Sequence, residues 1–153
     1  MLWLMAYTFL LRLPSEALPA CRASPEQTQY SQEQTLVWRE ADTVCIRMKR
    51  RKNRRMGSGT LRRGCTCASA EADFCKDMCP LHSLWERFFE KLPEGSHPWG
   101  AITPHMAMTR LRATLAELGV ANPETYGTHD FRRGAAEASL HVISKRIALP
   151  FDI

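Results

Sequence analysis

Hydrophobic residues cluster in two long stretches of the chain. Residues 2–13 are almost continuously apolar. This pattern predicts a buried helix ending at Pro14, because the residue before a proline avoids helical backbone angles. A second stretch, residues 81–92, carries large apolar side chains three and four positions apart, which predicts a helix packed on the core; its stripe is Leu81, Leu84, Trp85, Phe88, Phe89 and Leu92.

The later part of the chain predicts two more helices. The first begins at Pro104, with Thr103 as its N-cap, and ends at Gly119. Its periodic leucines are expected to point inward, namely Leu111, Leu115 and Leu118. The last helix is expected to start near Asp130 or Phe131 and to continue through the alanines that follow.

Short β-rich runs fill the space between the first two helical stretches. Residues 35–39 and 43–48 are predicted as strands joined by a turn at 40–42, with a third strand at 60–63. Residues 21–33 are small and polar and are expected to form a loop. The pattern therefore predicts an α+β fold, mainly helical with a small three-stranded antiparallel sheet. A chain of 153 residues fits one domain with its own core.

Positive charge is concentrated in the predicted hairpin. The net charge is +5 with a pI near 9.1, and residues 43–70 contain nine Lys or Arg and no acid. A field of this kind attracts polyanions, above all nucleic acid. The alternatives are a solvated loop or a nuclear-localisation signal. The basic run consists of Arg47, Lys49, Arg50, Arg51, Lys52, Arg54 and Arg55.

The N-terminal apolar run also permits a secretory interpretation. Residues 17–20 resemble a small-residue cleavage site, and the six cysteines would suit a small disulfide-rich secreted protein. However, no positive region precedes the run and Arg12 follows it directly. The run is also too short to span a bilayer. A buried core helix is therefore favoured, with secretion as the alternative and no membrane partner expected.

Cysteine and histidine gather between the predicted hairpin and the helix at 81–92. Cys65, Cys67, Cys75, Cys79 and His82 lie within 18 residues, and thiolates with an imidazole can form a tetrahedral zinc site. Such a site would fix the end of the hairpin to the start of the helix. The alternative is a set of reduced, unliganded surface cysteines.

A His-x-x-Arg pair opens the last predicted helix. His129 and Arg132 at this spacing can face one point. An arginine fork binds two phosphate oxygens, and a neighbouring histidine can donate a hydrogen bond or move a proton. The motif is common, and on its own it is better explained by a structural histidine that caps the start of a helix. Its context therefore decides the interpretation.

Three sequence boxes in order resemble the tyrosine recombinases, the phage-type integrases. The first box is Leu11-Arg12 followed by Ser15-Glu16, the second feature is Lys52 on the predicted hairpin, and the last box is residues 128–132. The residues of these boxes are especially similar to those of fungal, Crypton-like DNA breaking-rejoining proteins. The resemblance covers about residues 6–139. It implies a single partial catalytic domain: basic hairpin at about 35–63, Cys/His loop at 64–82 and second-box helix from about 129.

The resemblance assigns a role to each matching residue. Arg12 and Arg132 would hold the scissile phosphate, Glu16 would orient Arg12, and His129 would donate a hydrogen bond or act as a base. Lys52 would be the general acid that protonates the leaving oxygen, with Lys49 as its competitor. The basic run and Arg133 would contact DNA. The resemblance also favours four zinc ligands, Cys65, Cys67, Cys79 and His82, with Cys75 as a spare that could substitute. We expect a nuclear protein that binds DNA and needs no cofactor for catalysis. The family works on DNA as an oligomer, which is not expected of this shortened chain.

The chain departs from the family pattern in two places. Glu16 follows Arg12 by four residues where the family box has three, which a bulge at Pro14 would absorb. The family's nucleophilic tyrosine lies beyond the last box, whereas residues 140–153 contain none; without it a phosphotyrosine cannot form there. We therefore expect a chain shortened at both ends that binds DNA without cutting it. The competing hypotheses are an Arg-rich nucleic-acid-binding or nuclear-targeting module and the secreted protein.

Overall fold

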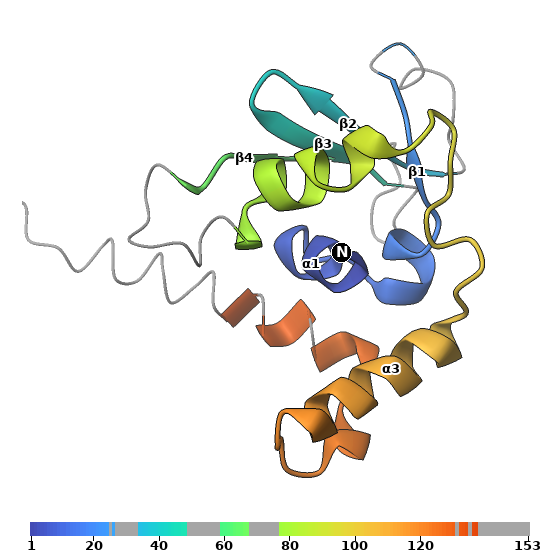
Figure 1. Ribbon diagram of the computed structural model, residues 1–153, viewed down its shortest axis with the longest axis vertical. Helices are drawn as coiled ribbons and strands as arrows, with labels where there is room; N and C mark the ends of the chain where they lie inside the picture. The colour runs from blue at the N-terminus through green and yellow to red at the C-terminus, as the bar shows by residue number, and fades with distance from the viewer. Residues whose placement is uncertain are drawn as a thin grey trace, which may run out of the picture.

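The computed structural model describes residues 1–24, 26, 34–48, 59–67, 77–130, 132–134 and 136–137. Its elements form three tiers (Figure 1), with the sheet and η4 at one end, α1 and η1 in the middle, and α3 with the helical segment after residue 127 at the other end. In chain order they are α1 (Leu2–Thr8), η1 (Leu13–Ala17), β1 (Ala20–Arg22), β2 (Thr35–Glu40), β3 (Thr43–Arg47), β4 (Thr60–Gly64), η4 (Pro80–Glu86), η5 (Phe89–Lys91), α3 (Pro104–Glu117) and η6 (Pro123–Thr125).

The sheet has four strands in the order β1-β2-β3-β4, so the fold is α+β with one strand more than expected. The antiparallel strands β2, β3 and β4 lie where the short β-rich runs predict them. The expectation that residues 21–33 are all loop is wrong at its start, where β1 pairs parallel with β2. Three residues are too few to show an alternating pattern. The outer edge of β1 is covered by hydrogen bonds between Arg22 and the backbone of Gly95 and Ser96.

The N-terminal apolar run does not form one helix. Helix α1 ends at Thr8, the chain reverses at Leu10 with a φ of 54°, and Pro14 lies in the first turn of η1 instead of ending a helix. A proline is tolerated there because its missing N–H has no helical partner to lose. Every part of the run is apolar because both elements are buried, so hydrophobicity alone does not reveal the break.

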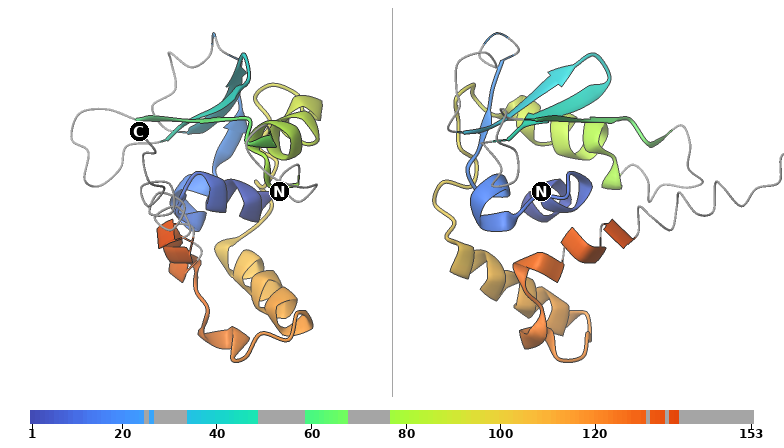
Figure 2. Two further views of the ribbon diagram at one scale, coloured as in Figure 1. Left: turned by 90° about the vertical axis from the view of Figure 1, so that its left-hand side faces the viewer. Right: turned by 180° about the vertical axis from the view of Figure 1, so that it is seen from behind.

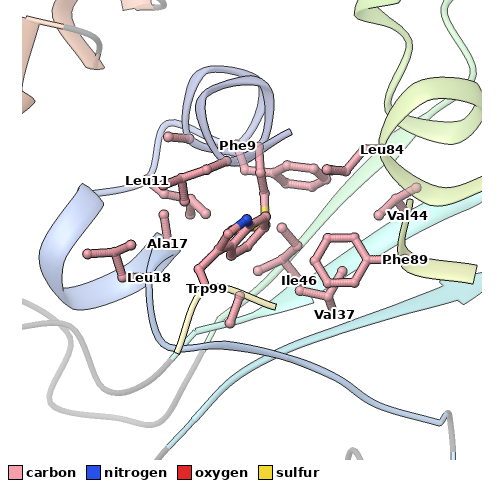
Figure 3. Packing of buried hydrophobic residues seen from close by; sticks show 14 of the residues in the cluster. Phe9, Leu11, Ala17, Leu18, Val37, Val44, Ile46, Leu84, Phe89 and Trp99 are labelled. Carbon is pink, nitrogen blue, oxygen red and sulfur yellow. The ribbon is translucent and has the colours of Figure 1, made fainter. Parts of the chain in front are cut away.

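The stripe at residues 81–92 packs on the core as predicted, but in two pieces, η4 and η5. Phe89 is fully buried and meets Trp99 edge-on, with 5.6 Å between ring centroids. Figure 3 shows these rings between α1 and the inner face of the sheet, beside Phe9, Ile46 and Val37. The sequence did not single out Trp99 as a core residue, since it lies in a loop rich in turn residues.

Helix α3 extends away from the sheet (Figures 1 and 2). Its start is as predicted, because the Thr103 side chain accepts a hydrogen bond of 3.1 Å from the backbone N–H of Met106. The expectation for its leucines is correct only for Leu111, since Leu115 is half-buried and Leu118 is 73% exposed. Within the described residues, no helix is both long and apolar enough to cross a membrane.

Candidate functional site

Arg12 stands at the start of the wide turn η1. The backbone carbonyl of Arg12 accepts hydrogen bonds from the N–H of Glu16 at 2.9 Å and of Ala17 at 3.1 Å, and the carbonyl of Leu13 accepts one from Leu18 at 3.0 Å. Bonds to the fifth residue along make this a π-helical turn, which holds one residue more than an α-helical turn. The four-residue spacing from Arg12 to Glu16 is accommodated in this wider turn, where the sequence suggested a bulge.

Glu16 lies beneath the turn rather than on the surface. It is only 4% exposed, and its Oε2 accepts a 2.8 Å hydrogen bond from the backbone N–H of Arg12. A buried carboxylate needs such donors, because burial without them is costly. Glu16 therefore fixes the backbone from which the Arg12 side chain projects. The resemblance implies that Glu16 orients Arg12. The hydrogen bond that the structure shows is to the backbone N–H of Arg12.

The last box, residues 128–132, begins a capped helical segment. Residues 128–130, 132–134 and 136–137 are helical, so the segment starts two residues earlier than expected. Asp130 Oδ2 accepts a 2.7 Å hydrogen bond from the N–H of Gly127, the return half of a capping box. From α3, Arg112 Nε donates to the carbonyl of Tyr126 at 3.2 Å. The start of the segment is thus held from both sides, which sets the direction of His129 and Arg132.

The first and last boxes meet at one pocket. A cavity of about 150 Å³ is lined by Arg12, Pro14, Ser15, Thr128, His129 and Arg132. A wider concavity of about 570 Å³ shares Arg12, His129 and Arg132 and adds Arg133 and Ala136. Figures 1 and 2 show η1 and the segment after residue 127 side by side in every view. None of these lining residues is acidic, so the pocket attracts anions. The smaller cavity is below the roughly 300 Å³ of a drug-sized ligand site and suits a single anionic group.

The remaining predicted DNA contacts fall mostly outside the described residues. Lys52 and its competitor Lys49 lie there, as do Arg50, Arg51, Arg54 and Arg55. Arg47 is described as the last residue of β3. Arg133 is exposed at the wider concavity. The hydroxyl residues Ser15 and Thr128 were not predicted as site residues, although both belong to the quoted boxes, and that position in the boxes was the available signal.

The four residues favoured as metal ligands come together in space. One ligand atom from each of Cys65, Cys67, Cys79 and His82 lies within 4.8 Å of all the others. His82 Nδ1 is 3.2 Å from the sulfurs of both Cys67 and Cys79 and 3.7 Å from that of Cys65. The sulfurs of Cys79 and Cys65 are 3.8 Å apart. Ligands at zinc bond lengths in a tetrahedron are about 3.5–3.8 Å apart, so this Cys₃His cluster has the dimensions of a metal site.

The thiols of the cluster differ in acidity. Burial tends to raise the pKa of Cys79, but hydrogen bonds from the backbone of His82 and Thr66, and from the side chains of His82 and Cys67, outweigh it and lower this pKa to about 6. Burial, followed by hydrogen bonds with Cys79 and Cys65, raises the pKa of Cys67 to about 12. The cluster therefore favours one thiolate even without a metal, which is the charge state that a cation recognises.

The cluster joins the end of the sheet to the helix that packs on it. Cys65 directly follows β4, and Cys79 is the N-cap of η4. All five described cysteines are free thiols, including the buried pair Cys21 and Cys45 on the other face of the sheet. The predicted spare ligand, Cys75, lies outside the described residues.

Comparisons with family models, curated proteins and solved structures returned no match to this chain.

Proposed function

We propose that this chain binds the phosphodiester backbone of DNA in the pocket between η1 and the segment that begins at Thr128. The observation that carries the proposal is that Arg12, from one end of the chain, lines the same pocket as His129 and Arg132, from the other. Two guanidinium forks and an imidazole around one small cavity match the oxygens of a single phosphate group. Among the described residues, no carboxylate lines the cavity to compete with that phosphate.

We propose further that the phosphate-binding pocket is that of a tyrosine-recombinase-like catalytic domain, because the three sequence boxes occur in the order that this family has. Under this proposal Arg12 and Arg132 hold the phosphate, and Glu16 fixes the backbone of Arg12. His129 supplies a further hydrogen-bond donor. The assignment of Lys52, or its competitor Lys49, as the general acid rests on the resemblance. Such contacts fix the position of the duplex without reading its sequence.

We propose binding without strand cleavage for this chain on its own. Cleavage in the resembling family needs a tyrosine whose hydroxyl attacks the phosphorus. The sequence has three tyrosines. Tyr7 and Tyr126 are not among the residues that line the pocket, and Tyr30 lies outside the described residues. The chain's own residues therefore supply phosphate binding and charge neutralisation.

For the Cys₃His cluster we propose a structural zinc. The ligand-atom distances and the mixed sulfur and nitrogen donor set fit tetrahedral zinc coordination. When bound, the ion would neutralise the thiolates and connect β4 to η4. It lies between secondary-structure elements rather than in the phosphate pocket, so its role is to stabilise the fold.

DNA-binding measurements with charge-matched variants test the main proposal. Arg12→Ala and Arg132→Ala should each weaken binding to a short duplex, because each removes one phosphate-binding fork. Arg110→Ala is the control, since Arg110 is 72% exposed on α3 and pairs with Glu117 at 3.7 Å. All three variants lose one positive charge, so a general effect of net charge would affect them equally. Equal affinities of the three variants would refute the pocket as the binding site.

The Arg-rich module is the second candidate, and the charge distribution favours it enough to be tested. If replacing the basic residues of 47–55 abolishes binding while Arg12→Ala and Arg132→Ala leave it intact, the chain binds nucleic acid through the basic run alone. Steep salt dependence is expected in both cases. The site variants, and not the salt dependence, therefore separate the two hypotheses.

A further inference from the structure

Two adjacent arginines of β4 point to opposite faces of the sheet. Arg63 is paired in register with Val44 of β3, and Arg62 with Cys45. Val44 belongs to the core cluster that includes α1 and η1 residues, whereas Cys45 belongs to the separate cluster on the other face. Because successive side chains of a strand alternate between faces, Arg63 lies on the α1 side and Arg62 on the opposite side.

The two side chains also have different partners. Arg62 is paired with a carboxylate, since its Nε lies 3.5 Å from Glu40 Oε2. Arg63 is exposed. Its Nε donates to the backbone carbonyl of Thr8 at 3.1 Å, and its Nη1 donates to the backbone carbonyl of Arg62 at 3.5 Å. Within the described residues no carboxylate lies in ion-pair range of Arg63. Neutral acceptors hold its guanidinium in place without cancelling its charge.

The hydrogen bond to the Thr8 carbonyl places Arg63 near the pocket. Thr8 ends α1 and precedes Arg12 by four residues, which span at most about 14 Å even when fully extended. The chain between them folds back, with the N–H of Leu11 bonded to the carbonyl of Ala6 at 2.9 Å. One DNA strand carries a phosphate about every 3.4 Å along the helix axis. A few nucleotides therefore cover both arginines.

We propose that Arg63 binds a second phosphate of the same DNA, next to the phosphate held by Arg12 and Arg132. This inference rests on the proposed function and adds a contact outside the three sequence boxes. The Cys₃His cluster supports it structurally, because Cys65 follows Arg63 by two residues and fixes the end of the strand that carries it. Two separated phosphate contacts would set the direction of the strand across the protein as well as its position.

Salt titrations of DNA affinity with Arg63→Gln and Arg62→Gln test the inference. Both variants remove one charge from β4, and glutamine at 63 can still donate to the Thr8 carbonyl. For Arg63→Gln we expect the slope of log affinity against log salt to become shallower by about 0.9, the value for one phosphate contact. Arg62→Gln should leave the slope unchanged. An unchanged slope for Arg63→Gln, or an equal change in both variants, overturns the inference.

A second measurement on the unmodified chain covers the case in which Arg63→Gln does not fold. Phenylglyoxal modifies accessible guanidinium groups, and peptide mass spectrometry reports each site. Saturating DNA should slow modification of Arg63 and not of Arg62; equal rates at Arg63 with and without DNA overturn the inference. If Arg12→Ala weakens binding while Arg63 fails both tests, only this inference is wrong. If the unmodified chain has no affinity for DNA, the inference and the proposed function fail together.

Discussion

Glu16 and Arg12 are connected across one wide turn, with the buried carboxylate accepting the backbone N–H of the arginine at 2.8 Å. An acidic side chain in the first turn of a helix also faces the positive end of its backbone dipoles. The bond ties the position of the Arg12 backbone to the core under η1. Any proposal that uses the Arg12 side chain therefore depends on this buried acid.

Removing that acid should destabilise the fold and weaken DNA binding. For Glu16→Ala we expect a loss of about 1–3 kcal/mol in the free energy of unfolding, because a buried N–H loses its acceptor. Glu16→Gln should lose less, since an amide oxygen can still accept. Urea denaturation measures both, with the exposed acid Glu94 as the control site. A Glu16→Ala variant as stable as Glu94→Ala would contradict this role.

Removing the cap of the second-box segment should release the groups that it orients. Asp130→Ala loses the bond to the Gly127 N–H, and we expect a destabilisation of about 1 kcal/mol together with weaker DNA binding. Asp130→Asn retains an acceptor, so its stability and DNA affinity should lie between those of Asp130→Ala and the unmodified chain. Glu137→Ala, an exposed change in the same helical segment, is the matched control. If the alanine variants at 130 and 137 bind DNA equally, the cap does not position His129 and Arg132.

Metal removal tests the Cys₃His cluster. Chain purified without chelator should contain one zinc per molecule, and a chelator should lower its melting temperature, because metal binding and folding are linked. Cys79→Ala and His82→Ala should lose the metal, and Cys45→Ala should retain it, since Cys45 is buried in the other cluster. Absence of stoichiometric zinc from the unmodified chain would refute the site.

Stability should fall at alkaline pH in part through Cys45. Burial, followed by the charge of Glu40, raises the pKa of this thiol from 9.0 to about 11, against an opposing effect of Arg62. The native state therefore keeps the proton when the unfolded chain has lost it, and the native state is disfavoured as pH rises from about 9 to about 11. The loss is on the order of 3 kcal/mol.

Cys45→Ala supplies the comparison for this titration. Urea denaturation at several pH values should show a smaller loss of stability between pH 9 and 11 in the variant than in the unmodified chain, because the shifted thiol is gone. Parallel curves for the two proteins would show that Cys45 does not contribute. At about pH 7 and below the thiol is protonated in both states, so no pH dependence from this group is expected there.

Local patterns predicted those elements that are bounded by recognisable turn or cap residues. Strands β2, β3 and β4 were predicted to within a residue or two because each has an apolar face and clear turns, and the N-cap Thr103 is a short-range signal. Strand β1 was missed because it has only three residues, too few to show a periodic pattern. The break at Leu10 was missed because the elements on both sides of it are buried, and a uniformly apolar run has no period to interpret.

The candidate site was predicted through the resemblance, which implies that Arg12 and Arg132 hold one phosphate with His129 beside them. The structure brings these three residues to one pocket and adds the lining residues Pro14, Ser15 and Thr128. The metal ligands were easier, because Cys65, Cys67, Cys79 and His82 lie close in sequence and short loops suffice to gather them. The opposite orientation of Arg62 and Arg63 depends on strand register, which a run of consecutive arginines does not reveal.

The central claim is that Arg12 and Arg132 bind the same phosphate, and a double-mutant cycle on DNA affinity tests it most directly. If they do, Arg12→Ala and Arg132→Ala each weaken binding, and the double variant loses less than the sum of the two, with a coupling of about 0.5–3 kcal/mol. Strictly additive losses would place the two arginines on separate phosphates. No loss from either change would contradict the account altogether.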